Sequence, residues 1–164
     1  MKNFFKNKRV FITGHTGFKG IWLVSILNHL GAKVYGYSKN DEFKKNFRKF
    51  CPTKKGSNYF GDILDKKKLF EKLNKVKPDI VIHLAAQSLV KKSFINPEET
   101  IKINIIGTLN LLECCRKIKT VKSIILATSD KCYENNNKKK YFKEKDKIGG
   151  DDPYSASKAS CEII

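Results

Sequence analysis

The sequence predicts an α/β fold built on a doubly wound parallel sheet. Short apolar segments typical of buried strands alternate with longer segments typical of helices along all 164 residues. The strand-like segments are apolar throughout rather than alternating, which is typical of parallel strands covered on both faces. A glycine-rich turn at residues 13–20 joins the first strand to the first helix. Together these observations favour right-handed crossovers and a single domain.

Each element has its own signal. Apolar runs predict strands at residues 9–13, 33–38, 59–63, 79–84 and 121–127. Helices are predicted at residues 17–30, 65–75, 97–118 and from 153 onward, with Gly31 ending the first, Asp65 capping the second, and Pro97 and Pro153 opening the others. The first helix is apolar nearly all round, so we expect it to be buried between layers. Residues 39–58 and 132–150 are rich in lysine or asparagine and predict loops.

The expected strand order is 3-2-1-4-5. This order places the ligand crevice between the first and fourth strands, at their carboxyl ends. Every motif described below follows a strand's carboxyl end or lies beside one, which supports a dinucleotide-binding fold of the Rossmann type.

The net charge of +18 comes almost entirely from lysine, because the chain has only three arginines, Arg9, Arg48 and Arg116. Surfaces that read bases favour arginine, and these lysines are scattered over loops and helix faces. The charge therefore predicts a solvated surface and no nucleic-acid site, although it attracts anionic ligands such as nucleotides.

Five cysteines form no C-x-x-C pair and no metal-binding spacing, and their number is odd. This usage favours a reduced, cytoplasmic compartment. Cys114 and Cys115 lie on the long predicted helix and are expected in the core. No apolar segment is long enough for a signal peptide or a membrane span, so we expect a soluble protein with no membrane partner.

The glycine-rich turn has the spacing of a phosphate-binding loop. Glycine permits positive φ and close approach of a pyrophosphate, and the following helix offers free N–H groups. The alternative is an ordinary strand-to-helix turn. The predicted cofactor-binding residues of this loop are Gly14, Thr16, Gly17, Phe18, Lys19 and Gly20.

The ends of the second and third strands leave the choice of cofactor open. An acidic residue normally ends the second strand when NAD is bound, but here Ser38 and Lys39 stand there, with Asp41 and Glu42 a little beyond. Ser38 suits a ribose hydroxyl, and Lys39 suits a 2′-phosphate. Asp62, followed by Ile63, suits the adenine amino group or is simply a turn residue. The cofactor is thus predicted to be NAD, with NADP not excluded.

Small residues follow the fourth strand and would let a cofactor pass close over the backbone. The cofactor-binding residues expected here are Leu84, Ala85, Ala86 and Gln87, joined by Asn104 on the long helix. His83 reads as a satisfied core histidine, and His15 as part of the phosphate loop rather than a catalytic group.

Two clusters suggest acid–base chemistry. Tyr154 and Lys158 have a Y-x-x-x-K spacing that places them on one face of a helix, where an ammonium group favours the phenolate. Thr128, Asp130 and Lys131 follow the fifth strand, and such a cluster can remove and donate protons. Each pattern alone also arises by chance or in a charged loop, but their order after a cofactor loop favours catalysis.

These residues together resemble the extended short-chain dehydrogenase/reductase family. Within it the chain is similar to the nucleotide-sugar 4,6-dehydratases, most closely to the branch that acts on CDP-glucose. The strings that carry the resemblance are T-G-H-T-G-F-K-G, H-L-A-A-Q, N-I-I-G-T, T-S-D-K-C-Y-E-N and G-G-D-D-P-Y-S-A-S-K. The discriminating string is T-S-D-K-C-Y, because relatives acting on other nucleotide-sugars usually carry a glutamate after the threonine and one further residue.

The resemblance implies a set of roles. Tyr154 and Lys158 would serve the oxidation at the sugar's carbon 4, with Thr128 bonded to the reacting hydroxyl. Asp130 would be the base at carbon 5, and Lys131 would help the 6-hydroxyl leave as water. NAD would remain bound as a prosthetic group. The family implies a homo-oligomer in the full-length form and a place in deoxysugar and surface-polysaccharide synthesis.

Full-length members of this family continue well beyond Lys158 into a smaller lobe that closes over the nucleotide-sugar. We therefore expect this chain to be a fragment of a longer enzyme or a truncated gene product, and inactive alone. The open alternatives are a nucleotide-sugar epimerase of the same family, which would lack the Asp130–Lys131 cluster, and an inactive nucleotide-binding remnant.

Overall fold

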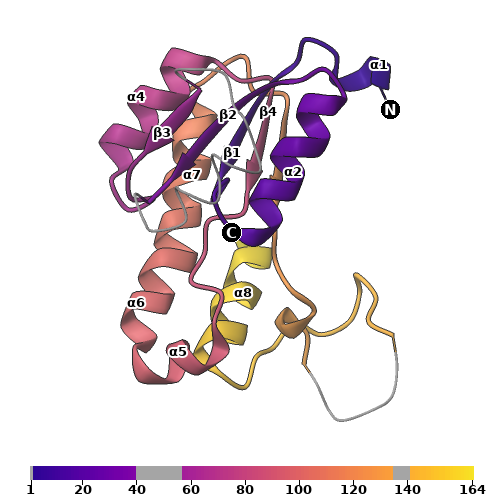
Figure 1. The fold of residues 1–164 in the computed structure, drawn as a ribbon. Coiled ribbons are helices and arrows are strands. Elements are labelled where there is room, and N and C mark those ends of the chain that lie inside the picture. Colours follow the sequence, from indigo (N-terminus) through magenta and orange to yellow (C-terminus); the bar gives the residue numbers. More distant parts are fainter. Residues whose placement is uncertain (1, 40–56, 135–140) are drawn as a thin grey trace. The chain divides into compact units, whose positions relative to one another are not determined.

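A computed structural model describes residues 2–39, 57–134 and 141–164 (Figure 1). Residues 40–56 of the loop predicted at 39–58, and residues 135–140 of the loop predicted at 132–150, lie outside the described residues. Five parallel strands form one sheet in the order β3-β2-β1-β4-β5, which confirms the predicted doubly wound topology. The strands are β1 (Arg9–Thr13), β2 (Lys33–Ser38), β3 (Asn58–Phe60), β4 (Ile80–His83) and β5 (Ser123–Leu126).

Most predicted helices are present, with three differences. The α-helices are α1 (Lys2–Phe5), α2 (Phe18–His29), α4 (Lys66–Val76), α5 (Val90–Ile95), α6 (Pro97–Ile101), α7 (Gly107–Arg116) and α8 (Pro153–Ile163). The helix predicted at 97–118 is interrupted by a π-helical turn, η1 (Lys102–Ile106). A 3₁₀ turn, η2 (Asp130–Cys132), precedes and overlaps the start of the loop predicted at 132–150. Helices α1 and α5 were not predicted. Among the described residues no helix has the length and apolar character needed to cross a membrane.

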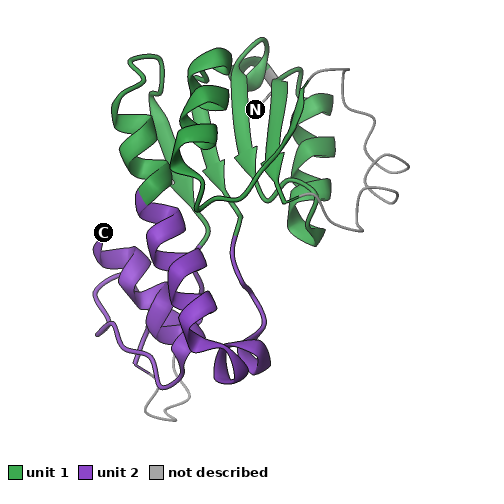
Figure 2. Cartoon of the chain, turned by 90° about the vertical axis from the view of Figure 1, so that its left-hand side faces the viewer, with its two compact units in different colours: residues 1–85, 110–127 green, residues 86–109, 128–164 purple. Residues whose placement is uncertain are grey.

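The described chain divides into two compact units (Figure 2). Unit 1 comprises residues 1–85 and 110–127, and unit 2 comprises residues 86–109 and 128–164.

Unit 1 is the sheet with its covering helices. Helix α2 lies on one face, and α4 and α7 lie on the other (Figure 1). One core cluster joins α2 to the strands and consists of Val10, Ile12, Val24, Leu27, Val34, Ile80 and Ile82. The side chains that alternate with these along β1 and β4, Phe11 and Val81, are also fully buried. The prediction that both strands are covered on both faces is confirmed.

Helix α2 corrects one expectation. The sequence predicted a helix buried all round, but Phe18, Trp22 and Ile26 are 82%, 63% and 53% exposed. These residues are four apart and therefore share the face that points away from the sheet, while Gly20, Val24 and Leu27 form the buried face. A helix with apolar residues on every side need not be buried on every side. Its sequence also does not identify the face that packs against the sheet.

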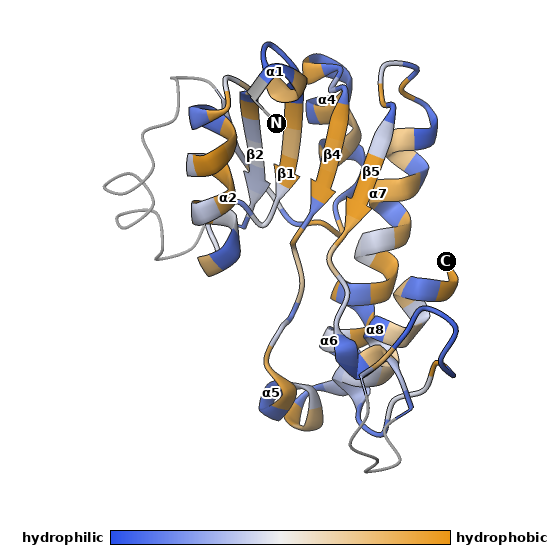
Figure 3. Ribbon diagram, turned by 90° about the vertical axis from the view of Figure 1, so that its right-hand side faces the viewer, coloured by the Kyte–Doolittle hydropathy of each residue, from blue (hydrophilic) through white to orange (hydrophobic). Residues whose placement is uncertain are grey.

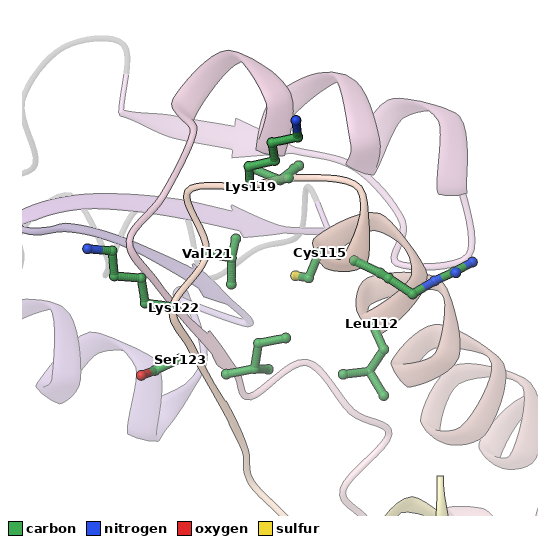
Figure 4. Close-up of a pocket in the computed structure, with 9 residues that line it drawn as sticks. Leu112, Cys115, Lys119, Val121, Lys122 and Ser123 are labelled. Carbon is green, nitrogen blue, oxygen red and sulfur yellow. The ribbon is translucent and has the colours of Figure 1, made fainter.

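Strand β5 is the edge of the described sheet. Ser123, Ile124 and Ile125 are exposed, and the strand pairs with β4 alone among the described strands. Beside its amino-terminal end lies a groove of about 520 Å³, lined by Leu112, Cys115, Arg116, Ile118, Lys119, Val121, Lys122, Ser123 and Ile124 (Figure 4). The candidate residues in unit 1 lie at the opposite, carboxyl edge of the sheet, so this groove is separate from them. Cys114 and Cys115 are buried, as predicted.

Unit 2 is built from short elements. Helix α8 packs against α5, α6, η1 and η2. The 3₁₀ turn leads to Tyr133, whose ring stacks on Phe142 with centroids 5.1 Å apart and whose backbone forms an isolated bridge with Ile148. Few of the buried side chains of this unit are apolar, and its candidate functional residues depend on the polar ones for their positions.

Candidate functional site

The glycine loop of unit 1 is a tightly wound turn. The Gly14 N–H donates to the Tyr37 carbonyl at 2.8 Å, and the Gly17 N–H donates to the Gly14 carbonyl at 3.0 Å. Gly14 has a φ of 71°, which favours glycine, and a Cβ there would lie 2.7 Å from the Ala85 nitrogen. A Cβ on Gly20 would lie 2.3 Å from the Gly14 carbonyl oxygen. Both positions therefore require glycine for the turn to form.

The loop presents the start of α2 to a ligand. Gly17 caps this helix without a side-chain hydrogen bond, and the first N–H groups of any helix lack partners within it. Phe18 and Lys19 are exposed in the same first turn. Uncapped N–H groups, the positive end of the helix dipole and a nearby ammonium group suit a pyrophosphate. The residues present therefore fit the predicted dinucleotide.

The ends of β2 and β3 lie side by side and place the remaining candidates of unit 1. Thr16 donates from its hydroxyl to Ser38 Oγ at 3.0 Å, and both side chains are buried. Lys39 Nζ lies 3.0 Å from Asp62 Oδ2. Ile63 is a core residue whose carbonyl accepts a hydrogen bond from the Asn110 amide. Thr16 and Ile63 thus support the site from within, while Lys39 and Asp62 face outward.

The Asp62 carboxylate is ionised and fixed. Partial burial acts to raise its pKa, but hydrogen bonds from the Leu64 N–H and from Lys39 outweigh burial, so the pKa lies below its usual value. The Leu64 N–H donates to Asp62 Oδ1 at 2.9 Å. The Tyr37 hydroxyl donates to the Asp62 carbonyl at 3.0 Å, which holds the backbone as well.

His83 ends β4 as a satisfied core residue, in line with its sequence interpretation. It is 5% exposed, and its Nδ1 lies 2.6 Å from the Thr13 hydroxyl oxygen. The same oxygen accepts a hydrogen bond from the Ala85 N–H at 3.2 Å. Thr13 therefore ties the end of β1 to the segment containing Leu84 and Ala85, a role that the sequence analysis did not assign. His15 is fully buried, and its ring occupies the space over Gly36.

In unit 2, Asn104 connects two segments that carry candidate residues. Its Oδ1 accepts from the Gln87 N–H at 2.8 Å, and its Nδ2 donates to the Gln87 carbonyl at 3.1 Å and to Ser157 Oγ at 2.8 Å. Ser157 in turn donates to the Tyr154 carbonyl at 2.7 Å. Asn104 is 1% exposed. The π-helical turn thus places one amide group where it fixes both the Gln87 backbone and α8.

The Gln87 side chain is also engaged internally. Its Nε2 donates to Thr100 Oγ1 at 2.9 Å and to the Leu89 carbonyl, and its Oε1 accepts from the Leu89 N–H at 2.7 Å. For Gln87 and Asn104 the structure therefore shows positioning roles. Their contact with a cofactor, like that of Ala86, stays a prediction.

Helix α8 carries the predicted acid–base pair. Asp152 caps it, accepting from the Ser155 N–H at 2.9 Å and from the Ser155 hydroxyl at 2.6 Å. The predicted start at Pro153 is confirmed. Tyr154 and Lys158 lie four residues apart in regular helix and therefore share a face. Lys158 is 7% exposed, which is unusual for a lysine side chain.

The turn at Asp130 packs against the helix that carries this pair. Ser129 caps the turn, accepting from the Lys131 N–H and donating to Asp130 Oδ1 at 3.1 Å. Asp130 and Lys131 are exposed, and η2 lies against α8. Cys132, next along the chain, is buried, and burial raises the pKa of its thiol. Unit 2 therefore contains all five predicted catalytic residues, two on α8 and three on the segment that leads into η2, with Thr128 half-buried at its start.

Sequence reasoning missed the residues that position others. Thr13, Thr100 and Ser157 were not among the predicted site residues, and each forms a hydrogen bond to a residue distant in sequence. Ser157 lies inside the quoted Y-S-A-S-K string, and its position between the tyrosine and the lysine is the one signal that marked it.

The chain resembles known proteins over nearly its whole length. Residues 11–164 match the family model described as GDP-mannose 4,6 dehydratase. CDP-glucose 4,6-dehydratase of Salmonella typhimurium is 41% identical over 99% of this chain and 46% of that protein. dTDP-D-glucose 4,6-dehydratase of Dictyostelium discoideum is 34% identical over 96% of this chain and 39% of that protein. The chain thus spans less than half the length of these relatives.

Solved structures give the same family. The UDP-glucose 4-epimerase of Thermus thermophilus, a complex with NAD, superimposes with a TM-score of 0.83 at 30% identity, over 94% of this chain and 49% of that one. The UDP-glucose 4-epimerase of Thermotoga maritima, with UDP-glucose, gives 0.84 at 29% identity, over 94% of this chain and 49% of that one. The chain belongs to the GDP-mannose 4,6-dehydratase family, within the extended short-chain dehydrogenases/reductases that include nucleotide-sugar 4,6-dehydratases and epimerases.

Proposed function

We propose that this chain is the dinucleotide-binding part of a 4,6-dehydratase that converts CDP-glucose to CDP-4-keto-6-deoxyglucose. The observation that carries the proposal is the packing of the Asp130–Lys131 turn against the helix of Tyr154 and Lys158. The 41% identity to a CDP-glucose 4,6-dehydratase supports the choice of substrate. Because the chain spans 46% of that relative, the activity is proposed for the whole protein.

The residues of unit 2 would divide the chemistry between them. A bound nicotinamide would supply the hydride acceptor for carbon 4 and the hydride donor for carbon 6. Tyr154 would remove the proton of the 4-hydroxyl, and Lys158 on the next turn of the helix would hold the nicotinamide ribose. Thr128 would hold the reacting hydroxyl. The hydrogen bonds from Ser157 to Tyr154 and from Asn104 to Ser157 support the position of this helix.

Elimination of water would use the exposed turn. A 4-keto group acidifies the proton on carbon 5, and the Asp130 carboxylate would remove it. Lys131, the adjacent cation, would donate the proton with which the 6-hydroxyl leaves as water. The hydride removed from carbon 4 would return to carbon 6 and the proton held by Asp130 to carbon 5, while the proton taken by Tyr154 would replace the one that Lys131 gave up. The reaction would then have no net redox change and would not consume the dinucleotide.

The test is turnover of CDP-glucose, followed by absorbance of the 4-keto product. We expect activity in a fusion that adds the remaining part of a relative, and little in the 164-residue chain, because the family's sugar-covering lobe is needed to exclude water. In the active form, Asp130→Asn should stop the reaction after oxidation and accumulate reduced dinucleotide. Tyr154→Phe should instead block the first hydride transfer. Stalling of both variants at one step would contradict this division of roles.

A nucleotide-sugar 4-epimerase is the second candidate, because solved relatives include UDP-glucose 4-epimerases with TM-scores above 0.8. An epimerase would return the 4-epimer of the sugar with its 6-hydroxyl intact. It would also tolerate Asp130→Asn, since it needs no base at carbon 5. Absence of any turnover in the fusion, together with retained dinucleotide binding, would favour the inactive remnant.

A further inference from the structure

The amino ends of the parallel strands form the edge of unit 1 that lies opposite the glycine loop (Figure 2). Short segments lead into four of the strands: residues 6–8 into β1, 31–33 into β2, 77–79 into β4 and 118–122 into β5. The residues that lead into β3 lie outside the described residues, apart from Ser57. Because parallel strands begin at one edge of a sheet, the four segments are brought to the same side of unit 1.

Backbone hydrogen bonds join these segments to one another. The Lys33 N–H donates to the Lys8 carbonyl at 2.8 Å, and the Asp79 N–H donates to the Arg9 carbonyl at 2.8 Å. The Lys122 N–H in turn donates to the Asp79 carbonyl at 2.9 Å. The four segments therefore form one continuous surface, which we call the amino edge.

The amino edge is strongly cationic. Its only carboxylate belongs to Asp79, and the Arg9 guanidinium binds both carboxylate oxygens at 3.2 Å, so this pair carries no net charge. Six lysines remain on the four segments, and all are exposed except the first-strand neighbour Lys8, which is half-buried. They are Lys6, Lys8, Lys33, Lys77, Lys119 and Lys122.

An exposed aromatic ring lies beside these lysines. Helix α1 directly precedes the segment 6–8, and the Lys8 N–H donates to the Phe5 carbonyl at 3.0 Å. Phe5 packs against the apolar core cluster. The Phe4 ring meets the Phe5 ring edge-on, with centroids 5.0 Å apart, and is 60% exposed. Phe4 is therefore an apolar side chain fixed at the border of a cationic surface.

A partner that complements this surface must be anionic and must also accept an apolar group. The surface of a bilayer that contains anionic lipids has both properties, because negative headgroups cover an apolar layer. Nucleic acid supplies the negative charge, but its recognition favours arginine and an element that enters a groove. The one arginine on the amino edge, Arg9, is already bound to Asp79.

We propose that the amino edge and Phe4 dock this chain on an anionic membrane surface. The expectation of no membrane partner was drawn from the lack of a long apolar segment, and docking on a bilayer surface requires none. The glycine loop lies at the carboxyl edge of the same sheet, so docking leaves that loop open to a dinucleotide. The inference is independent of the proposed function.

The test measures cosedimentation of the 164-residue chain with vesicles of phosphatidylcholine, with or without about 30% phosphatidylglycerol. We expect binding to the anionic vesicles alone, with a steep loss on added salt. Lys33→Gln, Lys119→Gln and Lys122→Gln together should weaken this binding about a hundredfold, at about fivefold per lysine. Phe4→Ser should weaken it about fivefold and leave its salt dependence unchanged.

The matched control removes three exposed lysines from the opposite edge of unit 1, at the start of α4. Lys66→Gln, Lys67→Gln and Lys68→Gln together give the same net charge as the triple variant of the amino edge. This control should change vesicle binding by less than about threefold, because its charges lie farther from the bilayer than the distance over which salt screens them. Circular dichroism should show all variants folded.

A fluorescent reporter tests the orientation. Phe4→Trp combined with Trp22→Phe moves the single tryptophan of the chain from α2 to α1. On anionic vesicles its emission should shift to shorter wavelength and be quenched by brominated lipid, whereas Trp22 in the wild-type chain should show neither effect.

Three results would overturn the inference: no binding of the wild-type chain to anionic vesicles, equal losses in the two triple variants, or quenching of Trp22 in place of the reporter on α1. Tighter binding to a DNA duplex of random sequence than to the vesicles would overturn it as well. Each of these results leaves the proposed function standing, because none concerns turnover or dinucleotide binding.

Discussion

The interiors of the two units are stabilised by different interactions. Unit 1 is an apolar core, in which Val10, Phe11, Ile12, Val24 and Val81 have no exposed surface. In unit 2 the buried apolar residues of the described chain are only Ile103, Cys132, Ala159 and Cys161, and its interior is largely polar. In the hydropathy colouring β4 and much of β1 are hydrophobic, whereas β2 is pale (Figure 3).

This difference teaches how each unit fixes its candidate residues. Apolar packing constrains volume but is not directional. It is enough to support the glycine loop, because the shape of that loop is determined by its backbone conformation. Hydrogen bonds constrain direction as well as distance, and the Asn104 network fixes the backbone of Gln87 and Tyr154 through specific atoms. We expect unit 1 to respond to changes in side-chain volume and unit 2 to changes in hydrogen-bonding groups.

The largest effect is expected from adding volume in unit 1. In Gly36→Ala the new Cβ would lie 2.1 Å from the buried His15 ring. This overpacking should lower the free energy of unfolding by about 3 kcal/mol or more, measured by urea denaturation. His15→Ala should restore much of the loss when combined with it. Gly149→Ala, whose Cβ would meet only Glu134, should change stability by less than about 0.5 kcal/mol.

The corresponding change in unit 2 keeps the branched shape of the side chain and removes its hydrogen bonds. Asn104→Leu would leave the Gln87 N–H and carbonyl buried without partners and should cost about 2–3 kcal/mol. The control is Asn110→Leu in unit 1, which loses two longer contacts of 3.4 Å and should cost about 1 kcal/mol. Equal costs in the two variants would show that the contrast between the units is wrong.

A smaller effect with a defined pH dependence is expected at the amino end of β1. The Arg9 guanidinium bonds to the Asp79 carboxylate at 3.2 Å and, as the largest cause, lowers the pKa of Asp79 below its usual 3.8. Because the folded-state pKa is depressed, this stability is present above the unfolded-state pKa and is lost as pH falls through the folded-state value. Asp79→Asn should therefore cost about 1.5 kcal/mol at pH 7, allowing for partial exposure, and progressively less below about pH 4.

The smallest effect compares one helix cap from each unit. Asp65 accepts from the Lys68 N–H at 3.0 Å in unit 1, and Asp152 accepts two hydrogen bonds from Ser155 in unit 2. Asp65→Ala should cost about 1 kcal/mol, and Asp152→Ala should cost more than that because the Ser155 hydroxyl loses its partner as well. Replacement of either aspartate by asparagine should preserve most of the cap. Thermal unfolding gives the ranking.

The elements of unit 1 were predicted from the sequence better than those of unit 2, because apolar packing leaves a pattern in the sequence and long-range hydrogen bonds do not. Strands β1 and β2 have their predicted bounds because apolar runs end at polar residues or glycine. Helix α5 was missed, since six residues without an apolar period give no signal. The internal role of Asn104 was invisible because its partners Gln87 and Ser157 lie 17 and 53 residues away. Directional contacts between distant residues leave no periodicity.

The π-helical turn η1 has a consequence for chain length. A π turn holds one residue more than an α turn, and Asn104 lies within it. Deleting one residue from this turn would give a more regular helix, but it would rotate the preceding segment by about 100° about the helix axis relative to the rest. Asn104 and Gln87 would then part although every interacting residue was retained. At this turn the number of residues therefore matters as much as their identity, because losing one residue would separate interacting groups that were all retained.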